Sequence, residues 1–314
     1  MECPFKLKGY DHIKVALSDV SSFESVLKNF GFSPVASHSK ALNSPTSVWG
    51  SGDAFFCLYE AKHPEAKKHF DLHGDTVFDL SFIVESEKEH PMLFEGVGKM
   101  KHTLVRERSF STTLAPRGIL KFDHNTLNVE QGQLETSVTL YENNFGFQKG
   151  QYFDIKGKET GLYSWVTRAP NRSVQIPFNE AADNKSQIQE YINVHRGPGV
   201  QHIAFRTTDI ISTMDAVMKD KTNRVKFLEI PDTYYEIVET RIKIKEDYSQ
   251  LKRLRILADQ ADNKGYLLQI FTQNIFGGFF IELIQREGNE GFGEGNFTAL
   301  FESIELDQKR RGVL

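Results

Sequence analysis

The chain has 314 residues, a formal net charge of −4 at pH 7 and 25 phenylalanines. This length is generous for one domain and sufficient for two domains with substantial cores. A slightly acidic chain with no basic run excludes the charged surface that binds nucleic acids or anionic membranes. Its two cysteines, Cys3 and Cys57, are too few for a disulfide framework or a thiolate metal site, so we expect a reducing compartment.

The first residues and the hydrophobic stretches bear on location. The opening MECPFKLKGY has no apolar core of the kind found in signal peptides. No stretch approaches the roughly 20 apolar residues of a membrane span. We therefore expect a cytoplasmic protein with neither nucleic-acid nor membrane partners.

Four segments open with a similar short apolar strand. The segment YDHIKV at 10–15 is followed by the helical pattern SSFESVLKNF and then by GFSPVA. The segment FDHNTL at 122–127 is followed by QLETSVTLYENN and then by FGFQKG. Segments 77–82 and 200–205 open in the same way. At least three of the four continue through a helix of about ten residues into a further strand, which predicts a repeat architecture.

The repeats predict the domain organisation. Each unit has the pattern βαβ followed by further strands, as in SVWGSGDAFFCLYEA and YLLQIFTQNIFGGFFIELIQR, and two units form one α+β module with a curved sheet around a pocket. Residues 1–118 are the predicted N-terminal module and residues 119–314 the C-terminal one. Between Glu85 and Gly118 the remaining strands of the second unit are hard to find, so we expect the first module to be shortened.

Three residues in apolar, strand-like runs are candidate metal ligands: His124, His202 and Glu282. Two imidazoles and one carboxylate leave half an octahedron open on ferrous iron. A carboxylate inside FFIELI needs a partner or a metal, because burying an unpaired charge is costly. The alternative for Glu282 is an ion pair, with Arg286 as the candidate partner.

The N-terminal module provides a comparison for these ligands. Its matching positions hold His12 and Asp79, and the strand that resembles FFIEL is FFCLY, which places Leu58 opposite Glu282. We therefore expect one metal per chain, with the N-terminal module as scaffold or oligomer contact. The other histidines have no spacing that requires a role and are predicted to lie at the surface: His38, His63, His69, His73, His90, His102 and His195.

The order of motifs from Phe122 to the C terminus resembles the 4-hydroxyphenylpyruvate dioxygenase family of the vicinal oxygen chelate fold. These motifs are IPFNE, KSQIQEYI, GVQHIAF, PDTYYE, LLQIF, FFIELIQR and GFGEGNFTALFESIE. The resemblance implies an Fe(II) enzyme that converts 4-hydroxyphenylpyruvate and O2 to homogentisate and CO2 in tyrosine breakdown. It also implies a homo-oligomer, a dimer or a tetramer.

The resemblance also assigns roles to individual residues. His124, His202 and Glu282 match the ferrous ligands of the family. Polar groups toward the substrate come from Gln201, Gln269, Asn179 and Ser164, with Gln187 in the supporting network. The apolar lining matches Pro177, Phe271, Phe280, Phe292, Phe297 and Phe301. These residue types suit the chemistry, because a 2-oxo acid chelates the iron, aromatic walls hold its ring and amides contact the phenol without adding charge.

The last segment is predicted to be an amphipathic helix over about 296–311. Phe297, Leu300, Phe301 and Ile304 recur at helical spacing, and three basic residues precede Gly312. The glycines of GFGEGNF could supply a hinge. We therefore expect this helix to act as a lid over the iron, because lids commonly control access and exclude water.

Two other kinds of function stay open. One keeps the fold and the triad but changes the product, as in 4-hydroxymandelate synthases or extradiol catechol dioxygenases. Asn179 and Ser164 resemble the homogentisate-forming pattern, and no histidine near these motifs could serve as a catechol-directed base. The other is a non-enzymatic small-molecule binding protein, which the complete triad disfavours.

Overall fold

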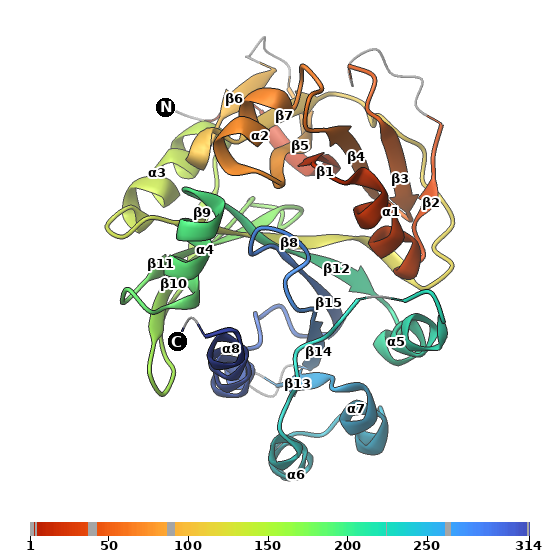
Figure 1. The fold of residues 1–314 in the computed structure, drawn as a ribbon, viewed down its shortest axis with the longest axis vertical. Coiled ribbons are helices and arrows are strands. Elements are labelled where there is room, and N and C mark those ends of the chain that lie inside the picture. The colour runs from red at the N-terminus through yellow and green to blue at the C-terminus, as the bar shows by residue number, and fades with distance from the viewer. Residues whose placement is uncertain are drawn as a thin grey trace.

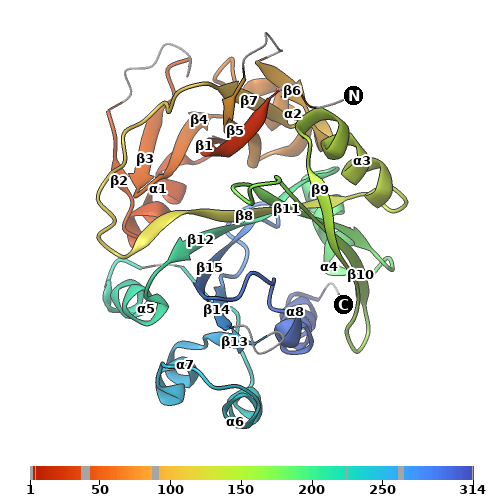
Figure 2. The same cartoon turned by 180° about the vertical axis from the view of Figure 1, so that it is seen from behind.

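The computed structural model describes residues 3, 5–36, 43–86, 92–223, 225–260, 265–312 and 314. Each half of the chain forms one mixed β-sheet, and the two sheets lie one above the other in Figure 1. The view from behind in Figure 2 shows the same two layers. This arrangement confirms the predicted α+β class with two repeat-built sheets. Among the described residues, no helix is both long and apolar enough to span a membrane.

The N-terminal sheet has seven strands in the order β2-β3-β4-β1-β5-β7-β6. α1 begins after Asp19, whose side chain accepts a hydrogen bond from the backbone N–H of Ser22, and it buries Phe23 and Leu27. The elements of this half are β1 (Lys6–Leu17), α1 (Val20–Asn29), β2 (Ser33–Pro34), β3 (Ser47–Ser51), β4 (Ala54–Glu60), α2 (Lys67–His73), β5 (Thr76–Glu85), β6 (Leu93–Glu95), the 3₁₀ helix η2 (Val97–Lys99) and β7 (Lys101–Val105).

The C-terminal sheet has eight strands in the order β13-β14-β15-β12-β8-β11-β10-β9. α6 and α7 lie farthest from the N-terminal sheet (Figure 1). The elements of this half are β8 (Ile119–Val129), α3 (Leu134–Phe145), β9 (Gln148–Lys156), β10 (Gly161–Arg168), β11 (Gln175–Ala181), α4 (Gln187–His195), β12 (Gly199–Thr207), α5 (Ile210–Lys219), α6 (Asp232–Arg241), α7 (Tyr248–Leu254), β13 (Leu257–Asp259), β14 (Tyr266–Phe271), β15 (Phe280–Glu287), the 3₁₀ helix η3 (Glu294–Asn296) and α8 (Phe297–Arg311).

Both sheets follow one plan. The first strands of the two units pair antiparallel at the centre, β1 with β5 and β8 with β12. Each unit ends with a strand parallel to its own first strand: β4, β7, β11 and β15. The unit that begins with β5 is the short one, because only residues 86–92 separate β5 from β6, whereas three helices lie between β12 and β13.

The predicted match of FFCLY with FFIEL, which placed Leu58 opposite Glu282, is wrong. FFCLY lies in β4, the parallel neighbour of β1, so its counterpart in the C-terminal sheet is β11. Glu282 lies in β15, the parallel neighbour of β12, and the corresponding N-terminal strand is β7. The two segments are therefore similar in sequence but do not occupy equivalent places in the two sheets.

One hydrophobic core joins the two sheets. Phe56 of β4 contacts Phe122 of β8 at 5.3 Å between ring centroids and Phe205 of β12 at 6.0 Å. Such edge-to-face pairs add to the burial of large apolar surface. A second cluster, which includes Phe55, Phe78 and Phe110, covers the opposite face of the N-terminal sheet, where His12 packs against Phe110.

The prediction that seven histidines lie at the surface is wrong for three of them. His69, His102 and His195 are buried. His102, for example, makes hydrogen bonds with the carbonyl of Leu80 (3.1 Å) and the hydroxyl of Tyr141 (2.6 Å). His63 and His73 are partly exposed, whereas His38 and His90 lie outside the described residues.

Candidate metal centre

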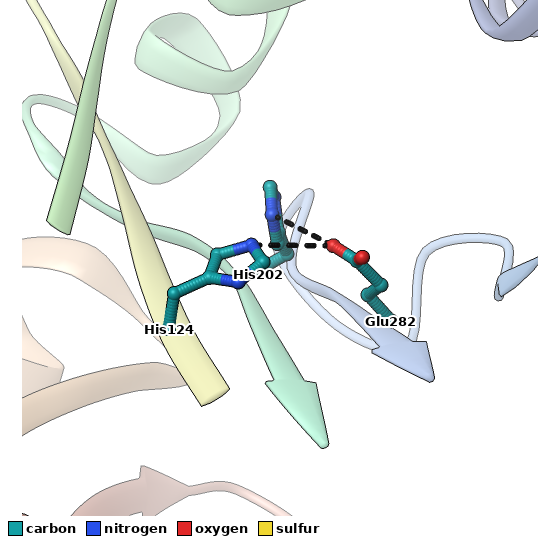
Figure 3. Close-up of side chains that lie close together, drawn as sticks. All are labelled: His124, His202 and Glu282. Carbon is teal, nitrogen blue, oxygen red and sulfur yellow. Dashed lines mark ion pairs between the residues drawn. The ribbon is translucent and has the colours of Figure 1, made fainter. Parts of the chain in front are cut away.

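Three neighbouring strands carry the three predicted ligands (Figure 3). His124 lies in β8, His202 in β12 and Glu282 in β15. In the middle strand, Ala204 pairs with His124 on one side and with Glu282 on the other. His202 precedes Ala204 by two positions and therefore faces the same side, because alternate residues of a strand share a face. The register of the sheet thus brings together side chains that are far apart in the sequence.

The ligand atoms lie within reach of one cation. Glu282 Oε2 is 3.3 Å from His124 Nε2 and 3.5 Å from His202 Nε2, and the candidate ligand atoms all lie within 4.8 Å of one another. Neighbouring ligands of an octahedral ion lie about 3 Å apart when each bond is about 2.1 Å. Two imidazoles and a buried carboxylate therefore fit ferrous iron with three further positions open.

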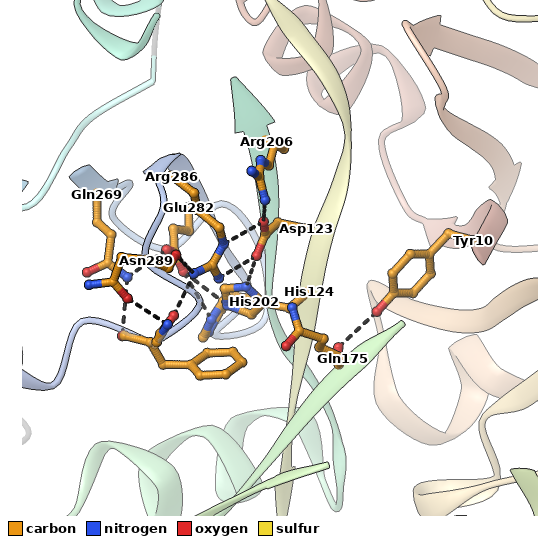
Figure 4. Close-up of polar contacts among 12 residues, drawn as sticks. Tyr10, Asp123, His124, Gln175, His202, Arg206, Gln269, Glu282, Arg286 and Asn289 are labelled. Atoms are coloured by element: carbon orange, nitrogen blue, oxygen red, sulfur yellow. Dashed lines mark hydrogen bonds and ion pairs between the residues drawn. The ribbon is translucent and has the colours of Figure 1, made fainter. Parts of the chain in front are cut away.

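Each ligand has a hydrogen-bond partner on the side away from this point. Figure 4 shows the partners of His124 and Glu282. His124 Nδ1 lies 2.9 Å from Asp123 Oδ1, and His202 Nδ1 lies 3.2 Å from Gln201 Oε1. Gln269 Nε2 donates to Glu282 Oε1 at 3.0 Å. Such partners fix the tautomer and orientation of ligands.

The electrostatics favour positive charge at the centre. Burial alone would lower the pKa of His124, but the carboxylates of Glu282 and Asp123 outweigh it and raise this pKa to about 9. Burial and the charge of His124 hold the pKa of His202 well below its usual value. The positive charge therefore lies on His124 while His202 stays neutral, and a divalent cation would supply positive charge to both nitrogens at once.

Arg286 is not the partner of Glu282. Its Nε and Nη2 atoms donate to the two carboxylate oxygens of Asp123 at 2.9 and 2.7 Å. Burial would raise the pKa of Asp123, but the Arg286 guanidinium and the hydrogen bond from His124 hold it well below its usual range. The structure therefore does not show the alternative in which Glu282 pairs with Arg286; the ion-pair contacts of Glu282 are with His124 and His202.

One cavity is lined by all fourteen residues predicted for the site. Ser164 and Asn179 are neighbours on β10 and β11, and Gln187 begins α4. The polar part of the lining comprises Ser164, Asn179, Gln187, Gln201 and Gln269, beside His124, His202 and Glu282. The apolar part comprises Pro177, Phe271, Phe280, Phe292, Phe297 and Phe301. The roles of these residues stay predictions, but their convergence on one cavity supports them.

Sequence reasoning missed several residues of the site. Thr126, Phe153 and Val166 also line the cavity, and the alternation of strand residues with His124 could have indicated Thr126. Asp123 was also missed, although the same Asp-His dipeptide occurs at 11–12. Arg286 was considered only as a partner of Glu282, whereas its actual partner is the distant Asp123. Asn296 gave no local signal, because it acts through Gln269.

The start of α8 is tied to the ligand shell. Asn296 Nδ2 donates to Gln269 Oε1 at 3.1 Å, and Tyr234 donates to Asn296 Oδ1 at 2.6 Å. Phe297 and Phe301 then extend from the helix into the cavity, where Phe297 contacts Phe153 at 5.3 Å between ring centroids. α8 therefore closes one side of the cavity in this structure.

Comparisons with known proteins agree with this geometry. Residues 121–238 match the family model described as the Glyoxalase/Bleomycin resistance protein/Dioxygenase superfamily. A 4-hydroxyphenylpyruvate dioxygenase of Legionella pneumophila is 36% identical over 99% of this chain and 97% of its own, and one of Pseudomonas aeruginosa is 51% identical over 63% of this chain and 55% of its own.

Solved structures show the same fold. A triple mutant of 4-hydroxymandelate synthase from Streptomyces coelicolor matches with a TM-score of 0.81 at 25% identity, over 96% of this chain and 99% of its own. Identity to the Legionella enzyme extends over almost the whole of both chains. The chain therefore belongs to the 4-hydroxyphenylpyruvate dioxygenase family.

Proposed function

We propose that this chain converts 4-hydroxyphenylpyruvate and O2 to homogentisate and CO2. The observation that carries the proposal is the convergence of His124, His202 and Glu282 in a cavity that six phenylalanines also line. The atoms balance, because the substrate loses one carbon as CO2 and the two oxygen atoms of O2 remain in the products. A ferrous ion held by the three residues would bind and activate O2.

The chain itself holds and orients the substrate. Phe280 stacks on His202 at 4.7 Å between ring centroids, and Phe292 meets His124 edge-on at 5.2 Å. These rings leave an apolar slot beside the ligands in which an aromatic substrate is restricted in orientation. Ser164 and Asn179 can donate hydrogen bonds to the phenol or the 2-oxo acid without adding a competing charge.

The chain also limits access of water. Phe297 and Phe301 of α8 cover the cavity, and Phe301 is buried against Leu162 and Ile188. Glu305 holds the helix in place by accepting hydrogen bonds from the backbone N–H groups of Glu159 and Thr160, both at 3.1 Å. We infer that α8 is the lid, which opens for the substrate and excludes water during turnover.

Oxygen uptake and product identification test the proposal. With 4-hydroxyphenylpyruvate and Fe(II), the wild type should consume O2 and release homogentisate. Glu282→Ala should lose this activity, whereas Glu287→Ala, a matched change near the end of the same strand, should keep it. Activity that survives Glu282→Ala would contradict the site assignment.

A second product deserves a direct comparison, because a 4-hydroxymandelate synthase shares the fold. The same reaction mixture distinguishes the two, since 4-hydroxymandelate carries its new hydroxyl on the side chain and homogentisate carries it on the ring. Release of 4-hydroxymandelate would favour the synthase. Iron as the resident metal, a cytoplasmic location and a homo-oligomeric state complete the proposal, and metal analysis, fractionation and sedimentation test them.

A further inference from the structure

Asp123 is a buried carboxylate that contacts one predicted metal ligand and two arginines. Its Oδ1 lies 2.9 Å from His124 Nδ1 and accepts from Arg286 Nη2 at 2.7 Å. Its Oδ2 accepts from Arg286 Nε at 2.9 Å and from Arg206 Nη1 at 3.3 Å. The side chains of Asp123 and Arg286 are 2% and 1% exposed. A buried carboxylate this fully paired stays ionised and can only accept hydrogen bonds.

An ionised Asp123 determines which nitrogen of His124 carries the proton. Because the carboxylate only accepts, His124 must donate from Nδ1, which leaves Nε2, the nitrogen that faces Glu282, as the atom that would bind a cation. The same contact fixes the rotation of the ring. Carboxylate partners of this kind orient histidine ligands and make them more basic.

The Nη1 atom of Arg286 binds the turn that precedes Phe292, a residue of the cavity wall. This atom donates to the carbonyl of Asn289 at 3.1 Å and to that of Gly291 at 2.6 Å. The guanidinium carbon lies 5.7 Å from the ring centroid of Phe292, which in turn packs on His124. Arg286 therefore connects the carboxylate behind His124 with the turn that presents Phe292 to the cavity (Figure 4).

We propose that Asp123 and Arg286 are positioning residues that act together: Asp123 sets the tautomer and orientation of His124, and Arg286 locks both Asp123 and the Phe292 turn in place. This inference rests on the proposed metal site. It assigns neither residue to the substrate, because neither lines the cavity.

The N-terminal module supplies a matched control. Asp11 precedes His12 as Asp123 precedes His124, and Asp11 Oδ2 lies 2.7 Å from His12 Nδ1. The other oxygen of Asp11 accepts from the backbone N–H of Ser109 at 2.8 Å. Asp11→Asn therefore makes the same chemical change in the same dipeptide of a buried strand, away from the cavity.

The experiment measures binding of Co(II) and Fe(II) by competition with a chelator, and the visible spectrum of the Co(II) form. Asp123→Asn should bind metal about 10- to 100-fold more weakly than wild type, with a shifted Co(II) spectrum. Asp11→Asn should match wild type in both. Since Asp123→Asn leaves the Arg286 guanidinium buried without its partner, the double variant Asp123→Asn/Arg286→Gln removes both charges and should show the same loss if the single variant does not fold.

The outcomes separate the two proposals. Wild-type metal affinity and spectrum in folded Asp123→Asn, or in the double variant, would overturn the positioning role. An equal loss in Asp11→Asn would also overturn it, because the effect would then be a general loss of structure. Tight metal binding by the wild type without dioxygenase activity would instead refute the proposed reaction and leave the positioning role standing.

Discussion

His12 in β1 and His124 in β8 occupy the same place in their sheets, and an aspartate precedes each of them. In the C-terminal sheet, His124 pairs with Ala204, which pairs in turn with Glu282. In the N-terminal sheet, His12 pairs with Ser81. Because Asp79 pairs with Lys101 and Phe82 with Leu104, the residue beside Ser81 is Thr103. The place of Glu282 is thus held by Thr103, and by the same register that of His202 is held by Asp79.

The N-terminal site contains a cation that belongs to the chain. Lys14 Nζ lies 3.3 Å from Asp79 Oδ2 and 3.3 Å from Glu65 Oε1, and the lysine is buried. Thr103 donates to Asp79 Oδ2, and Ser81 Oγ lies 3.1 Å from His12 Nε2. Among the described residues, the atoms that correspond to the metal ligands, His12 Nε2 and the carboxylate oxygens of Asp79, therefore already have partners. The same sheet geometry gives a closed hydrogen-bond network in one module and an open cation site in the other.

The comparison shows how little separates a metal site from a structural core. The Asp-His dipeptide and the strand register are shared by the two modules. In the N-terminal module, however, Asp79 replaces the second histidine, Thr103 replaces the glutamate, and Lys14 supplies a positive charge. The two modules also differ in what covers the site. Phe110 packs on His12, whereas α8, the proposed lid, covers the cavity at His124.

The largest contrast is expected between the two histidines. His124→Ala should reduce metal affinity and turnover by more than the roughly 100-fold typical of an outer contact, because it removes a ligand itself. His12→Ala should leave turnover per folded molecule unchanged but lower the free energy of unfolding by about 2–3 kcal/mol, because Asp11 loses a buried partner. Chelator competition, oxygen uptake and urea unfolding measure the two effects. Loss of metal in His12→Ala would remove the distinction between the modules.

Lys14 tests the paired state of the N-terminal site. Lys14→Met leaves the buried Asp79 without its cation, whereas Glu65 keeps its contact with Lys101. The variant should lower the free energy of unfolding by about 3–5 kcal/mol. Combining it with Asp79→Leu should recover much of this loss, because replacing a buried ion pair with apolar residues is often neutral. Urea unfolding of the single and double variants gives the answer. An unchanged free energy in Lys14→Met would show that the ammonium contributes nothing.

The residues of the candidate site were easier to predict from the sequence than the strand pairing of the N-terminal sheet. Residues with chemical character inside apolar strands, such as His202 and Glu282, are conspicuous because burial of such groups needs a reason. The position of Thr103 was not predictable, because its strand β7 lies in the shortened unit, whose strands were hard to find in the sequence. Leu58 was misassigned, because the composition of a strand does not reveal its neighbours in the sheet. Burial of His102 depends on Tyr141, a partner from the other module. Long-range pairing decides all three cases.

A pH-dependent effect is expected from three histidines that are buried outside the cavity. Burial lowers the pKa of His69, His102 and His195 to about 4. The unfolded chain, with histidine pKa values near 6.5, then binds protons first as the pH falls. Stability from these groups is therefore complete above about pH 6.5 and is lost between about pH 6.5 and 4, by up to about 1.4 kcal/mol per pH unit for each group.

His102→Gln isolates one of these contributions. Subtracting the unfolding free energies of the variant from those of the wild type cancels every other titrating group, including the metal ligands. The difference should shrink as the pH falls through the window from 6.5 to 4. Urea unfolding at several pH values measures it, and a difference that stays constant with pH would mean that His102 does not stay neutral in the folded protein.

The smallest effect is expected at the C-terminal end of α8, the proposed lid. Arg311 and Gln308 of α8 both contact Glu190 of α4, and Lys309 contacts Glu159. Such partly exposed pairs contribute about 0–1 kcal/mol each and are screened by salt. Glu190→Gln should therefore raise KM for the substrate by less than about fivefold, and the effect should diminish at high salt, whereas kcat should change little. If α8 is instead a fixed wall like Phe110 in the N-terminal module, KM should be the same in variant and wild type at every salt concentration.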